Sequence, residues 1–467
     1  MNVATHHSRF VVDSSWRRTS DGLVVFGGSP IKMFRLGQAG AQVAELIEQG
    51  QTLPRGHEQL TERLLDAGAI HPLIDSHAEL PYRLGDVTVV IPAFVRSAIE
   101  ASRLGKLVSQ CEDVAEVIVV DDGSSHALPT LDKATVVTLG TNSGPGSARN
   151  AGLSRVATPL VAFIDLDVTL HAATPQKLLP YFVDPRLGIV APRVVSENVI
   201  STIDKYDQVR SPLDLGPNEA RIAPGTRVSY VPSAMWLCRT EAIRAVHGFD
   251  ESLRFGEDVD ALWRVIGAGW RCRYQPQVTV GHQPRATLQE FFTQRRMYGR
   301  SAAELASRHP GSVAPVRVSW HSAGMWGLIA CGFPILGGLL GTYTVLALRR
   351  KLRDVPNSLD ESIRLAGLGN LHGARILASA ITRAWWPLAA IMALFSRRAR
   401  TVLIAAAVVP AMYEWWSKRP PLDPLRYLAL RAIDDASYGV GVWEGAIAQR
   451  SAEALMPDLS AWSTGAR

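Results

Sequence analysis

Short apolar runs alternate with polar turns over roughly the first 300 residues, and longer apolar stretches follow them. From residue 86 onward the apolar runs are continuous, which is typical of strands buried on both faces of a sheet. We predict strands over 87–91, 117–120, 136–139 and 160–164, with helices over 98–110 and from 146 to 153. Three β–α repeats in this order imply an α/β fold with a mostly parallel sheet. Ligands of such sheets bind beyond the carboxyl ends of the strands.

Residues 1–80 show a different pattern, which we interpret as a small separate module. We predict a strand over 23–26, helices over 38–49 and 57–67, and a returning segment over 69–73. This order indicates a winged-helix-like module, with structural packing and DNA binding as alternative roles. The second helix carries more acid than base, so we expect no nucleic-acid partner. The first residues lack a long apolar segment, so we expect no secretory signal.

Residues 315–467 form an apolar region that we expect to be helical. Its stretch 323–348 contains no charged residue and exceeds the roughly 20 residues needed to span a bilayer. Weaker apolar stretches cover 376–395 and 402–416, and basic and Trp side chains lie near their ends, as at membrane interfaces. We therefore expect membrane association, with 323–348 as a spanning helix. A buried core helix and in-plane or re-entrant helices remain the alternatives.

Composition narrows the class of protein further. A length of 467 residues indicates more than one domain, and 47% hydrophobic residues exclude a disordered chain. The 4 cysteines lie far apart without a CxxC pair, which disfavours a disulfide scaffold and a zinc ribbon. A net charge of +6 suits anionic partners such as nucleotides or acidic lipids without selecting among them.

The sequence supports neither a dinucleotide-binding fingerprint nor a P-loop. The stretch 142–146, NSGPG, is rich in glycine, but it does not match the dinucleotide fingerprint. A dinucleotide fingerprint needs a third glycine where this chain has Arg149, and it should follow the first strand. The chain also lacks a GxxxxGK[ST] loop, so P-loop chemistry is unsupported.

Carboxylates gather where the predicted strands end. The strand 117–120 runs into Asp121 and Asp122, and the strand 160–164 runs into Asp165-Leu166-Asp167. Two carboxylates beside a fully apolar strand would lack compensation without a cation. A hard divalent ion held there can bridge a diphosphate and neutralise a leaving group. The alternative is a charged turn after a strand.

A second acidic cluster, GEDVD over 256–260, leads into an apolar helix. A carboxylate in the first turn gains from the helix dipole and can remove a proton from an attacking hydroxyl. The alternative is an ordinary helix start with acid in its first turn. His282 follows another predicted strand, and it is either structural or a metal ligand.

The segments VVIPAF, VIVVDDGSS, NSGPGSARNAGL, FIDLDV and FDESLRFGEDVDALWRV, in this order, resemble family 2 glycosyltransferases of the type-A fold. The resemblance covers roughly 87–300 and implies a catalytic domain over 86–300 that binds a UDP-sugar with Mg²⁺ or Mn²⁺. It implies that Asp258 is the catalytic base, with Glu257 next in line, and that Asp167 and His282 bind the metal. The nucleotide sugar would be bound by Pro92, Ala93, Asp121, Asp122, Gly144, Arg149 and Asp165. Processive synthases carry QxxRW, but the stretch 294–298 reads QRRMY, so the resemblance does not imply a processive enzyme.

The N-terminal module resembles the peptide-recognition domains of peptide-maturation systems, and a precursor peptide or peptide chaperone is its expected partner. With the apolar C-terminal region, the whole chain resembles the glycosyltransferases of mycofactocin systems. That resemblance implies inverting transfer of glucose, in β-1,4 linkage, onto the peptide-derived redox cofactor premycofactocin. The apolar region leads us to expect the enzyme at the cell membrane. Because activated sugar nucleotides are cytosolic, we expect the catalytic domain on the cytoplasmic side. The alternatives are a transferase acting on a lipid or cell-envelope polysaccharide, and a membrane-tethered scaffold without activity.

Overall fold

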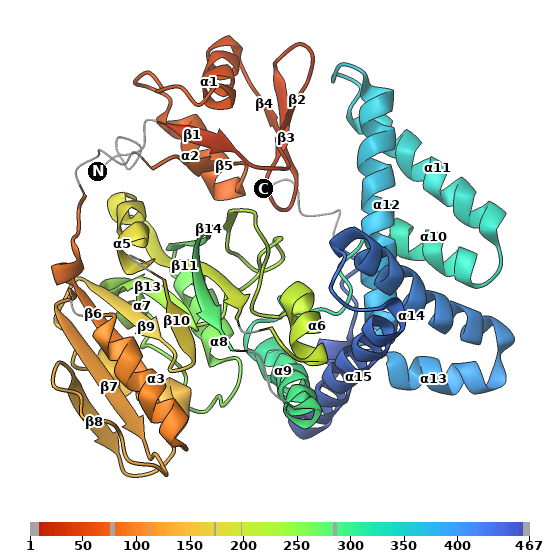
Figure 1. Ribbon diagram of the computed structural model, residues 1–467. Coiled ribbons are helices and arrows are strands. Elements are labelled where there is room, and N and C mark those ends of the chain that lie inside the picture. Colours follow the sequence, from red (N-terminus) through yellow and green to blue (C-terminus); the bar gives the residue numbers. More distant parts are fainter. Residues whose placement is uncertain are drawn as a thin grey trace. The chain divides into compact units, whose positions relative to one another are not determined.

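The computed structural model describes residues 9–74, 80–111, 113–171, 174–197, 199–283 and 287–460 (Figure 1). The chain divides into two compact units. The first consists of Met1–Arg18, Gly22–Asn198 and Ser211–Gln283, and the second of Thr19–Asp21, Val199–Arg210 and Pro284–Arg467. We call them the catalytic unit and the helical unit. Residues 1–8, on which the expectation of no secretory signal partly rests, lie outside the described residues.

A mixed nine-stranded sheet forms the centre of the catalytic unit, and it confirms the predicted α/β fold class. Its strands are β6 (Val87–Ala93), β7 (Glu116–Asp122), β8 (Thr135–Leu139), β9 (Leu160–Ile164), β10 (Val168–Leu170), β11 (Leu187–Ser196), β12 (Ala220–Arg221), β13 (Met235–Arg239) and β14 (Arg271–His282). The order is β10-β14-β11-β13-β9-β6-β7-β8, with β12 paired to β14. Strands β9, β6, β7 and β8 are parallel, as are β11 and β14, and the other pairs are antiparallel.

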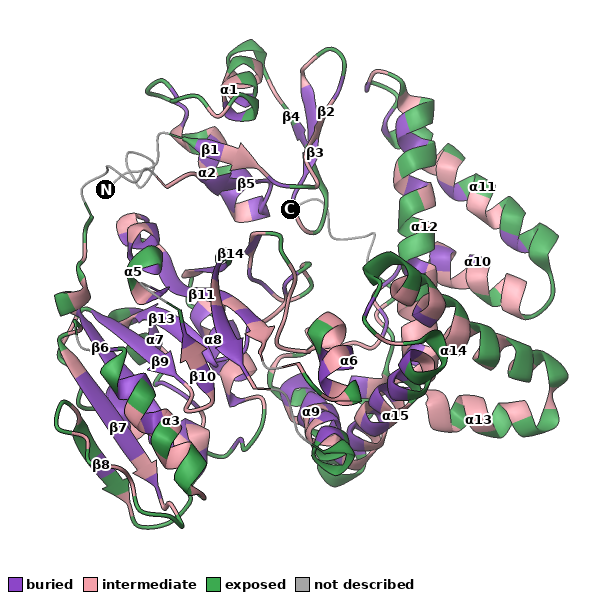
Figure 2. Ribbon diagram, viewed as in Figure 1, coloured by how far each residue is buried: buried purple, intermediate pink, exposed green. Residues whose placement is uncertain are grey.

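Helices cover this sheet and bury its central strands. They are α3 (Ala98–Ser109), α4 (Pro145–Leu153), α5 (Thr174–Leu178), α7 (Thr240–Ala245) and α8 (Glu257–Gly267), with short 3-10 turns η2 (Leu84–Asp86) and η3 (Leu179–Val183). Every residue of β9 is buried, and so are most residues of β6 and β7 (Figure 2). Burial on both faces is the reason these strands are continuous apolar runs. Helix α3 starts at Ser97, whose hydroxyl accepts the Glu100 N–H, and turns Leu104, Leu107 and Val108 inward.

The N-terminal module has its own small core around Phe10, Val25, Ile47 and Leu64. Its elements are β1 (Phe10–Val12), β2 (Arg17–Arg18), β3 (Val24–Gly27), β4 (Lys32–Arg35), α1 (Gln38–Glu48), α2 (Glu58–Ala67) and β5 (Ile70–Pro72). Both predicted helices and the strand at 23–26 are present, and Gly68 ends α2 in the left-handed conformation that favours glycine. The returning segment pairs with β1, and β2, β3 and β4 form a separate sheet.

Ion pairs join this module to the rest of the catalytic unit. Arg271 of β14 contacts Glu62 and Asp66 of α2, with 2.7 Å to the Asp66 carboxylate. Arg227 donates to buried Asp13 at 2.8 Å, and the His71 ring lies 3.0 Å from the same carboxylate oxygen. The acids of α2, which disfavour a nucleic-acid partner, therefore have a docking role that only the folded chain reveals.

The helical unit contains α6 (Thr202–Arg210), α9 (Leu288–Arg308), α10 (Trp320–Ala330), α11 (Pro334–Lys351), α12 (Ser358–Thr382), α13 (Trp386–Phe395), α14 (Arg397–Lys418), α15 (Pro424–Gln449) and the short turn η4 (Glu453–Leu455). The two units divide the chain differently from the predicted domains of 86–300 and 315–467. Helix α9 packs along α15, and both α9 and α6 belong to the helical unit.

The predicted single helix over 323–348 is wrong. The chain breaks between α10 and α11, where Gly332 has a φ of +86° and Pro334 begins the second helix. Within the described ranges, no single helix has the length and apolarity to span a membrane. The one pair that meets the criterion together is α12 with α13, which are bent by 83° at their junction.

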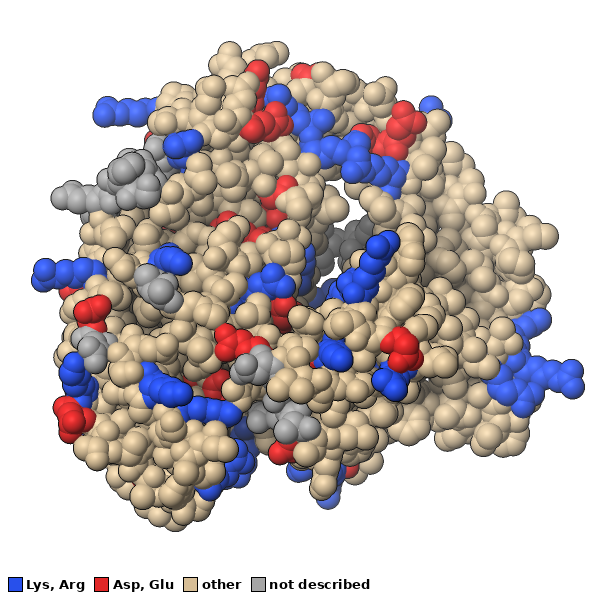
Figure 3. Space-filling view, viewed as in Figure 1, with Lys and Arg blue, Asp and Glu red and all other residues tan. Residues whose placement is uncertain are grey.

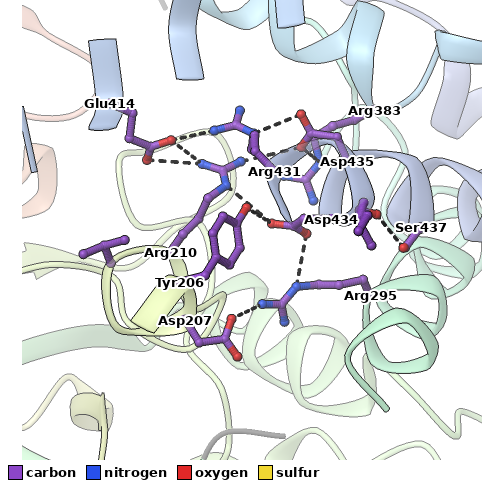
Figure 4. Close-up of polar contacts among 12 residues, drawn as sticks. Tyr206, Asp207, Arg210, Arg295, Arg383, Glu414, Arg431, Asp434, Asp435 and Ser437 are labelled. Atoms are coloured by element: carbon purple, nitrogen blue, oxygen red, sulfur yellow. Dashed lines mark hydrogen bonds and ion pairs between the residues drawn. The ribbon is translucent and has the colours of Figure 1, made fainter. Parts of the chain in front are cut away.

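A buried network of ion pairs connects helices α6, α9 and α15 of the helical unit (Figure 4). Arg295 of α9 is 2% exposed and contacts Asp207 of α6 and Asp434 of α15, and the Tyr206 hydroxyl donates to Asp434 at 2.9 Å. The same network includes Arg210, Arg383, Glu414, Arg431 and Asp435. Its four arginines face four carboxylates, and matched partners are the condition under which buried charges are tolerated.

The module contact yields a prediction about stability and pH. Burial alone would raise the pKa of Asp13, but hydrogen bonds from His71, Arg227 and Ser15 outweigh it and hold the pKa well below its usual range. Asp13→Asn should therefore lower the free energy of unfolding by about 3 kcal/mol at neutral pH, because Arg227 loses its charged partner. A depressed carboxylate pKa stabilises the fold above the unfolded pKa of about 4, and that contribution is lost as the pH falls further.

Urea unfolding of the wild-type protein and of Asp13→Asn from about pH 7 down to about pH 3 checks this, since the difference between their stabilities should narrow progressively below about pH 4. The matched control is Asp132→Asn, at an exposed position of the same unit. If Asp13→Asn and Asp132→Asn had the same free energy of unfolding at neutral pH, Asp13 would not stabilise the fold through Arg227.

Candidate active site

The sheet topology brings the predicted site residues to one edge of the sheet. Ala93 at the end of β6 pairs with Asp121 of β7, and Asp165 directly follows β9. Val168 of β10 pairs with His282 of β14, so the end of the latter strand lies beside the Asp165-Leu166-Asp167 turn. Pro92 and Ala93, which are predicted to bind the nucleotide sugar, lie at the end of β6. Ala93 is buried and Pro92 is partly buried. Val168 and His282, which are 282 − 168 = 114 positions apart, are thus brought together by strand pairing alone.

Asp121 and Asp122 have different local partners. Asp121 accepts the Ser124 N–H at 2.9 Å, which closes the turn after β7. Asp122 is buried and accepts the Ser143 N–H at 2.6 Å and the Gly144 N–H at 2.9 Å, one on each oxygen. Between the two loops, Gly123 has a φ of +71°, and a Cβ there would lie 2.7 Å from the Asn142 nitrogen. Asp122 therefore anchors the glycine-rich loop, and the nucleotide contacts assigned to both aspartates stay predictions.

Arg149 occupies the centre of the site. Gly144, with a φ of +96°, and Pro145 begin α4, which carries Arg149 inward until it is 2% exposed. Its guanidinium donates to Glu257 at 2.8 Å and to Asp165 at 2.7 Å, and it lies over the Phe249 ring. The residue predicted to bind the nucleotide sugar is therefore bound to two carboxylates of the enzyme. It links the DxD turn to the start of α8.

The DxD turn divides its two carboxylates between different partners. Burial raises the pKa of Asp165, an effect that Arg149 opposes and the carboxylate of Asp167 reinforces. Asp167 turns the other way, and its Oδ2 lies 3.1 Å from the His282 Nε2. The pair predicted to bind metal is thus in contact.

The donor set around Asp167 fits an open cation site. Within the described ranges, no group of three or more His, Cys, Asp or Glu side chains is placed to hold a metal ion. A carboxylate and an imidazole suit Mn²⁺, and Mg²⁺ is commonly held by one or two carboxylates with substrate phosphates and water. Asp167 and His282 therefore match a cation that shares its coordination with a diphosphate, and they do not match a closed structural site.

The GEDVD cluster also separates into distinct roles. Asp260 is buried and pairs with Arg264 at 2.7 Å, and Arg264 in turn donates to the carbonyl of Gly248. Burial first, and then the neighbouring Asp258 carboxylate, raises the pKa of Glu257 to about 7. Asp258 is half-buried in the first turn of α8 and accepts the Ser233 N–H at 3.2 Å. Glu257 accepts a hydrogen bond from Arg149 and Asp260 accepts one from Arg264, whereas the contact of Asp258 is to a backbone N–H.

Asn150 is a residue of this site that sequence reasoning missed. Its amide donates to the Phe249 carbonyl at 2.8 Å and accepts the Phe249 N–H at 2.9 Å, as a paired strand would. It thereby fixes the FDES loop, which precedes the GEDVD cluster, against α4. The neighbouring Arg149 was singled out, but no local signal connects position 150 with position 249, because the contact depends on tertiary packing.

Comparisons with known proteins identify the family to which the chain is similar. The family model "Glycosyl transferase family 2" matches residues 88–246. A pre-mycofactocin glycosyltransferase of Mycobacterium tuberculosis is 39% identical, over 96% of this chain and 97% of its own. The succinoglycan biosynthesis protein ExoO of Rhizobium meliloti is 26% identical, over 42% of this chain and 59% of its own. A mannosyltransferase of Pyrobaculum calidifontis, solved with GDP-Man and Mn²⁺, has a TM-score of 0.39 and 19% identity over 67% of this chain and 93% of its own.

We predict that UDP binds more tightly with Mn²⁺ than without it, and that Asp167→Ala removes this difference. The fold should survive, because this side chain is 35% exposed and lies outside the core. We expect UDP affinity in Mn²⁺ to fall by about tenfold or more, to the level seen without metal, as loss of a ligand of the cation requires. Isothermal titration of UDP with and without Mn²⁺ measures this. Asp132→Ala serves as the matched exposed control, and an affinity for UDP that still depends on Mn²⁺ in Asp167→Ala would exclude Asp167 as a ligand.

Proposed function

The chain belongs to the family of pre-mycofactocin glycosyltransferases, within glycosyl transferase family 2, and we propose that it transfers a hexose from a UDP-sugar to premycofactocin. The observation that carries the acceptor assignment is the extent of the match. The relative aligns with almost the whole of both chains, so it includes the N-terminal module and the helical unit as well as the catalytic sheet. The succinoglycan relative aligns with 42% of this chain.

The proposed reaction is a single displacement at the anomeric carbon. Asp258 takes the proton of the acceptor hydroxyl, whose oxygen attacks the anomeric carbon from the face opposite the diphosphate. The bond from that carbon to the diphosphate oxygen breaks, UDP leaves with the electron pair, and an α-linked donor becomes a β-linked product. A divalent cation held by Asp167 and His282 would supply the positive charge that stabilises the leaving diphosphate. The donor we propose is UDP-glucose, and the product a β-1,4-linked chain.

The arrangement of the carboxylates supports Asp258 as the base. Arg149 holds Asp165 and Glu257, and Arg264 holds Asp260. Asp258 lies in the first turn of α8, where the helix dipole favours the ionised carboxylate that a base requires. The other acids then position the helix and the turn, and they are not needed for proton transfer.

A lipid or cell-envelope polysaccharide is the second candidate acceptor. The similarity to the succinoglycan protein over the catalytic region supports it. The stretch QRRMY argues against a processive form, because Met297 and Tyr298 stand where processive synthases carry the Arg-Trp pair of QxxRW. Incubation with a panel of UDP-sugars and premycofactocin, followed by mass spectrometry, tests both candidates. The proposal requires a gain of whole hexose units on premycofactocin, and transfer to lipid extracts alone would replace it.

Asp258→Asn should leave UDP-sugar binding intact and lower kcat by roughly two or more powers of ten, as expected when a general base is removed. Steady-state kinetics at saturating acceptor, with donor affinity measured in parallel, provide the readout. The matched control is Asp260→Asn in the same motif, which should lower the melting temperature through Arg264 while kcat changes far less. Near-normal turnover of Asp258→Asn would assign the base elsewhere, with Glu257 next.

The proposal also assigns the N-terminal module to acceptor binding. Strand β4 lies at an edge of its three-stranded sheet. Ile31 directly before it and Met33 within it are exposed apolar residues, and Lys32 and Arg35 are basic neighbours. An unpaired edge offers hydrogen bonds to an extended peptide, and neighbouring side chains add selectivity. The nucleotide, metal and base residues all lie after position 86, so the donor site needs no contribution from this edge.

Ile31→Ser with Met33→Ser should therefore raise the acceptor KM by about tenfold and leave UDP-sugar hydrolysis unchanged, since the loss of two apolar contacts is worth about that much. Substitution is preferable to deletion of the module, because deletion would also break the contacts of Asp13 and Arg271. Val136→Ser, an exposed apolar residue on the edge strand β8, is the matched control. A joint loss of hydrolysis, acceptor binding and thermal stability would reduce the module to a structural role.

A further inference from the structure

Two helical hairpins of the helical unit place apolar side chains in solvent at their tips. Helices α10 and α11 form the first hairpin, and α13 and α14 form the second. The tips meet, because Arg398 at the start of α14 donates to the Cys331 carbonyl in the turn between α10 and α11. We call the combined surface the tip surface, and define it by Phe333, Ile335, Leu339, Met392, Leu394 and Phe395, which are 54% to 86% exposed.

This exposure is unusual for the kind of helix involved. Helix α13 reads WPLAAIMALF and is apolar on all its faces, yet none of its residues is buried. A helix that is apolar all round normally lies in a protein core or in lipid. Contiguous exposed apolar surface marks an interaction site. The tip surface therefore has a partner that is itself apolar.

The charge around the tip surface indicates which partner it is. Residues 320–353 and 383–413 contain no Asp or Glu, whereas each segment contains four Lys or Arg residues. Arg397, Arg398 and Arg400 follow directly on the exposed end of α13. Figure 3 shows one group of Lys and Arg side chains at the right edge of the face in view, and others scattered over the rest of that face. Basic side chains that border exposed apolar ones match a bilayer surface with anionic headgroups. A second copy of this chain fits worse, since a two-fold contact would set these arginines against one another.

The lengths of the helices favour insertion in the plane of the bilayer. Helices α10 and α13 have 11 and 10 residues, which at 1.5 Å per residue makes each about 15 Å long. That is about half of the roughly 30 Å hydrocarbon core. The longer helix α11 ends in the three basic residues Arg349, Arg350 and Lys351, which prefer the headgroup region.

From these observations we infer that the tip surface is a membrane-docking site, which inserts into one leaflet of an anionic bilayer without crossing it. Phe333 and Ile335 of one hairpin and Leu394 and Phe395 of the other enter the boundary between headgroups and acyl chains. Arg397 and Arg400 contact lipid phosphates beside them. This docking is independent of the acceptor, and it replaces the spanning helix that the sequence predicts over 323–348.

Flotation of the purified full-length protein with preformed vesicles tests the docking. Binding should be about tenfold stronger to vesicles that contain phosphatidylglycerol than to phosphatidylcholine alone, and salt should weaken it. Leu394→Glu with Phe395→Glu should abolish binding, and Arg397→Gln with Arg400→Gln should remove the preference for the anionic lipid. Leu425→Glu with Ile447→Glu is the matched control, because both side chains are exposed apolar residues of α15 away from the tips. UDP-sugar hydrolysis should be unchanged in all these variants.

A fluorophore on Cys331 measures the depth of insertion. Cys331 is exposed in the turn between α10 and α11, and the other three cysteines are buried, so labelling is selective. Its emission should shift to the blue with anionic vesicles, and a quencher near the headgroups should act more strongly than one deep in the acyl chains. Stronger quenching by the deep probe would overturn in-plane insertion. Absence of vesicle binding would overturn the docking site, as would a dimer in solution that the Leu394→Glu and Phe395→Glu changes dissociate.

Discussion

One buried guanidinium organises the catalytic site. Arg149 donates to Asp165, directly after β9, and to Glu257 at the start of α8, and it thereby links two elements that are far apart in the sequence. Either carboxylate would be costly to bury alone, and the arginine would be equally costly without them. The three charges therefore constrain one another. The DxD turn and the helix that carries Asp258 hold a fixed separation because the same side chain bonds to both.

That constraint distributes roles among acids that look alike in the sequence. The DxD turn and the Asp258-Val259-Asp260 part of GEDVD each contain one aspartate bonded to an arginine and one that contacts another partner. Asp165 and Asp260 are bonded to Arg149 and Arg264, whereas Asp167 contacts His282 and Asp258 accepts a backbone N–H. The two aspartates bonded to arginine, Asp165 and Asp260, therefore have structural roles. The proposed mechanism needs one carboxylate to bind a cation and another to accept a proton. The neighbouring carboxylates are bonded to arginines, so they are not available for either role.

The helical unit has two parts with different surface properties, the buried network around Arg295 and Asp434 and the exposed hairpin tips. Around Arg295 and Asp434, every buried charge has a partner of opposite sign, and α6 is held to α9 and α15 by these pairs. At the hairpin tips, apolar side chains are exposed and the nearby charges are all basic. The helical unit thus combines an interior of paired charges with an exposed apolar tip whose nearby charges are basic, and the proposed membrane docking rests on this arrangement.

The sequence by itself determined the features that depend on near neighbours. Continuous apolar runs identified β6, β7 and β9, Gly68 marked the end of α2, and the polar ends of strands located Asp121, Asp122, Asp165, Asp167 and His282 at one edge. Parallel pairing follows from the β–α repeats, and it carries the ends of these strands to the same place. The ordered motifs identified the family for the same reason, because they are local stretches.

Only the tertiary structure decided which of these side chains touch one another. The pairing of Arg149 with Glu257 spans 108 positions, and that of Arg271 with Glu62 spans 209, so no pattern within one helix or strand encodes either contact. The prediction of one continuous helix over 323–348 was wrong for a related reason. Its Gly332 and Pro334 are compatible with a membrane helix as well as with a turn, and the packing of α11 against α10 selected the turn. Hydrophobic periodicity records whether a residue is buried, whereas the partner of a buried charge is set by which elements pack together.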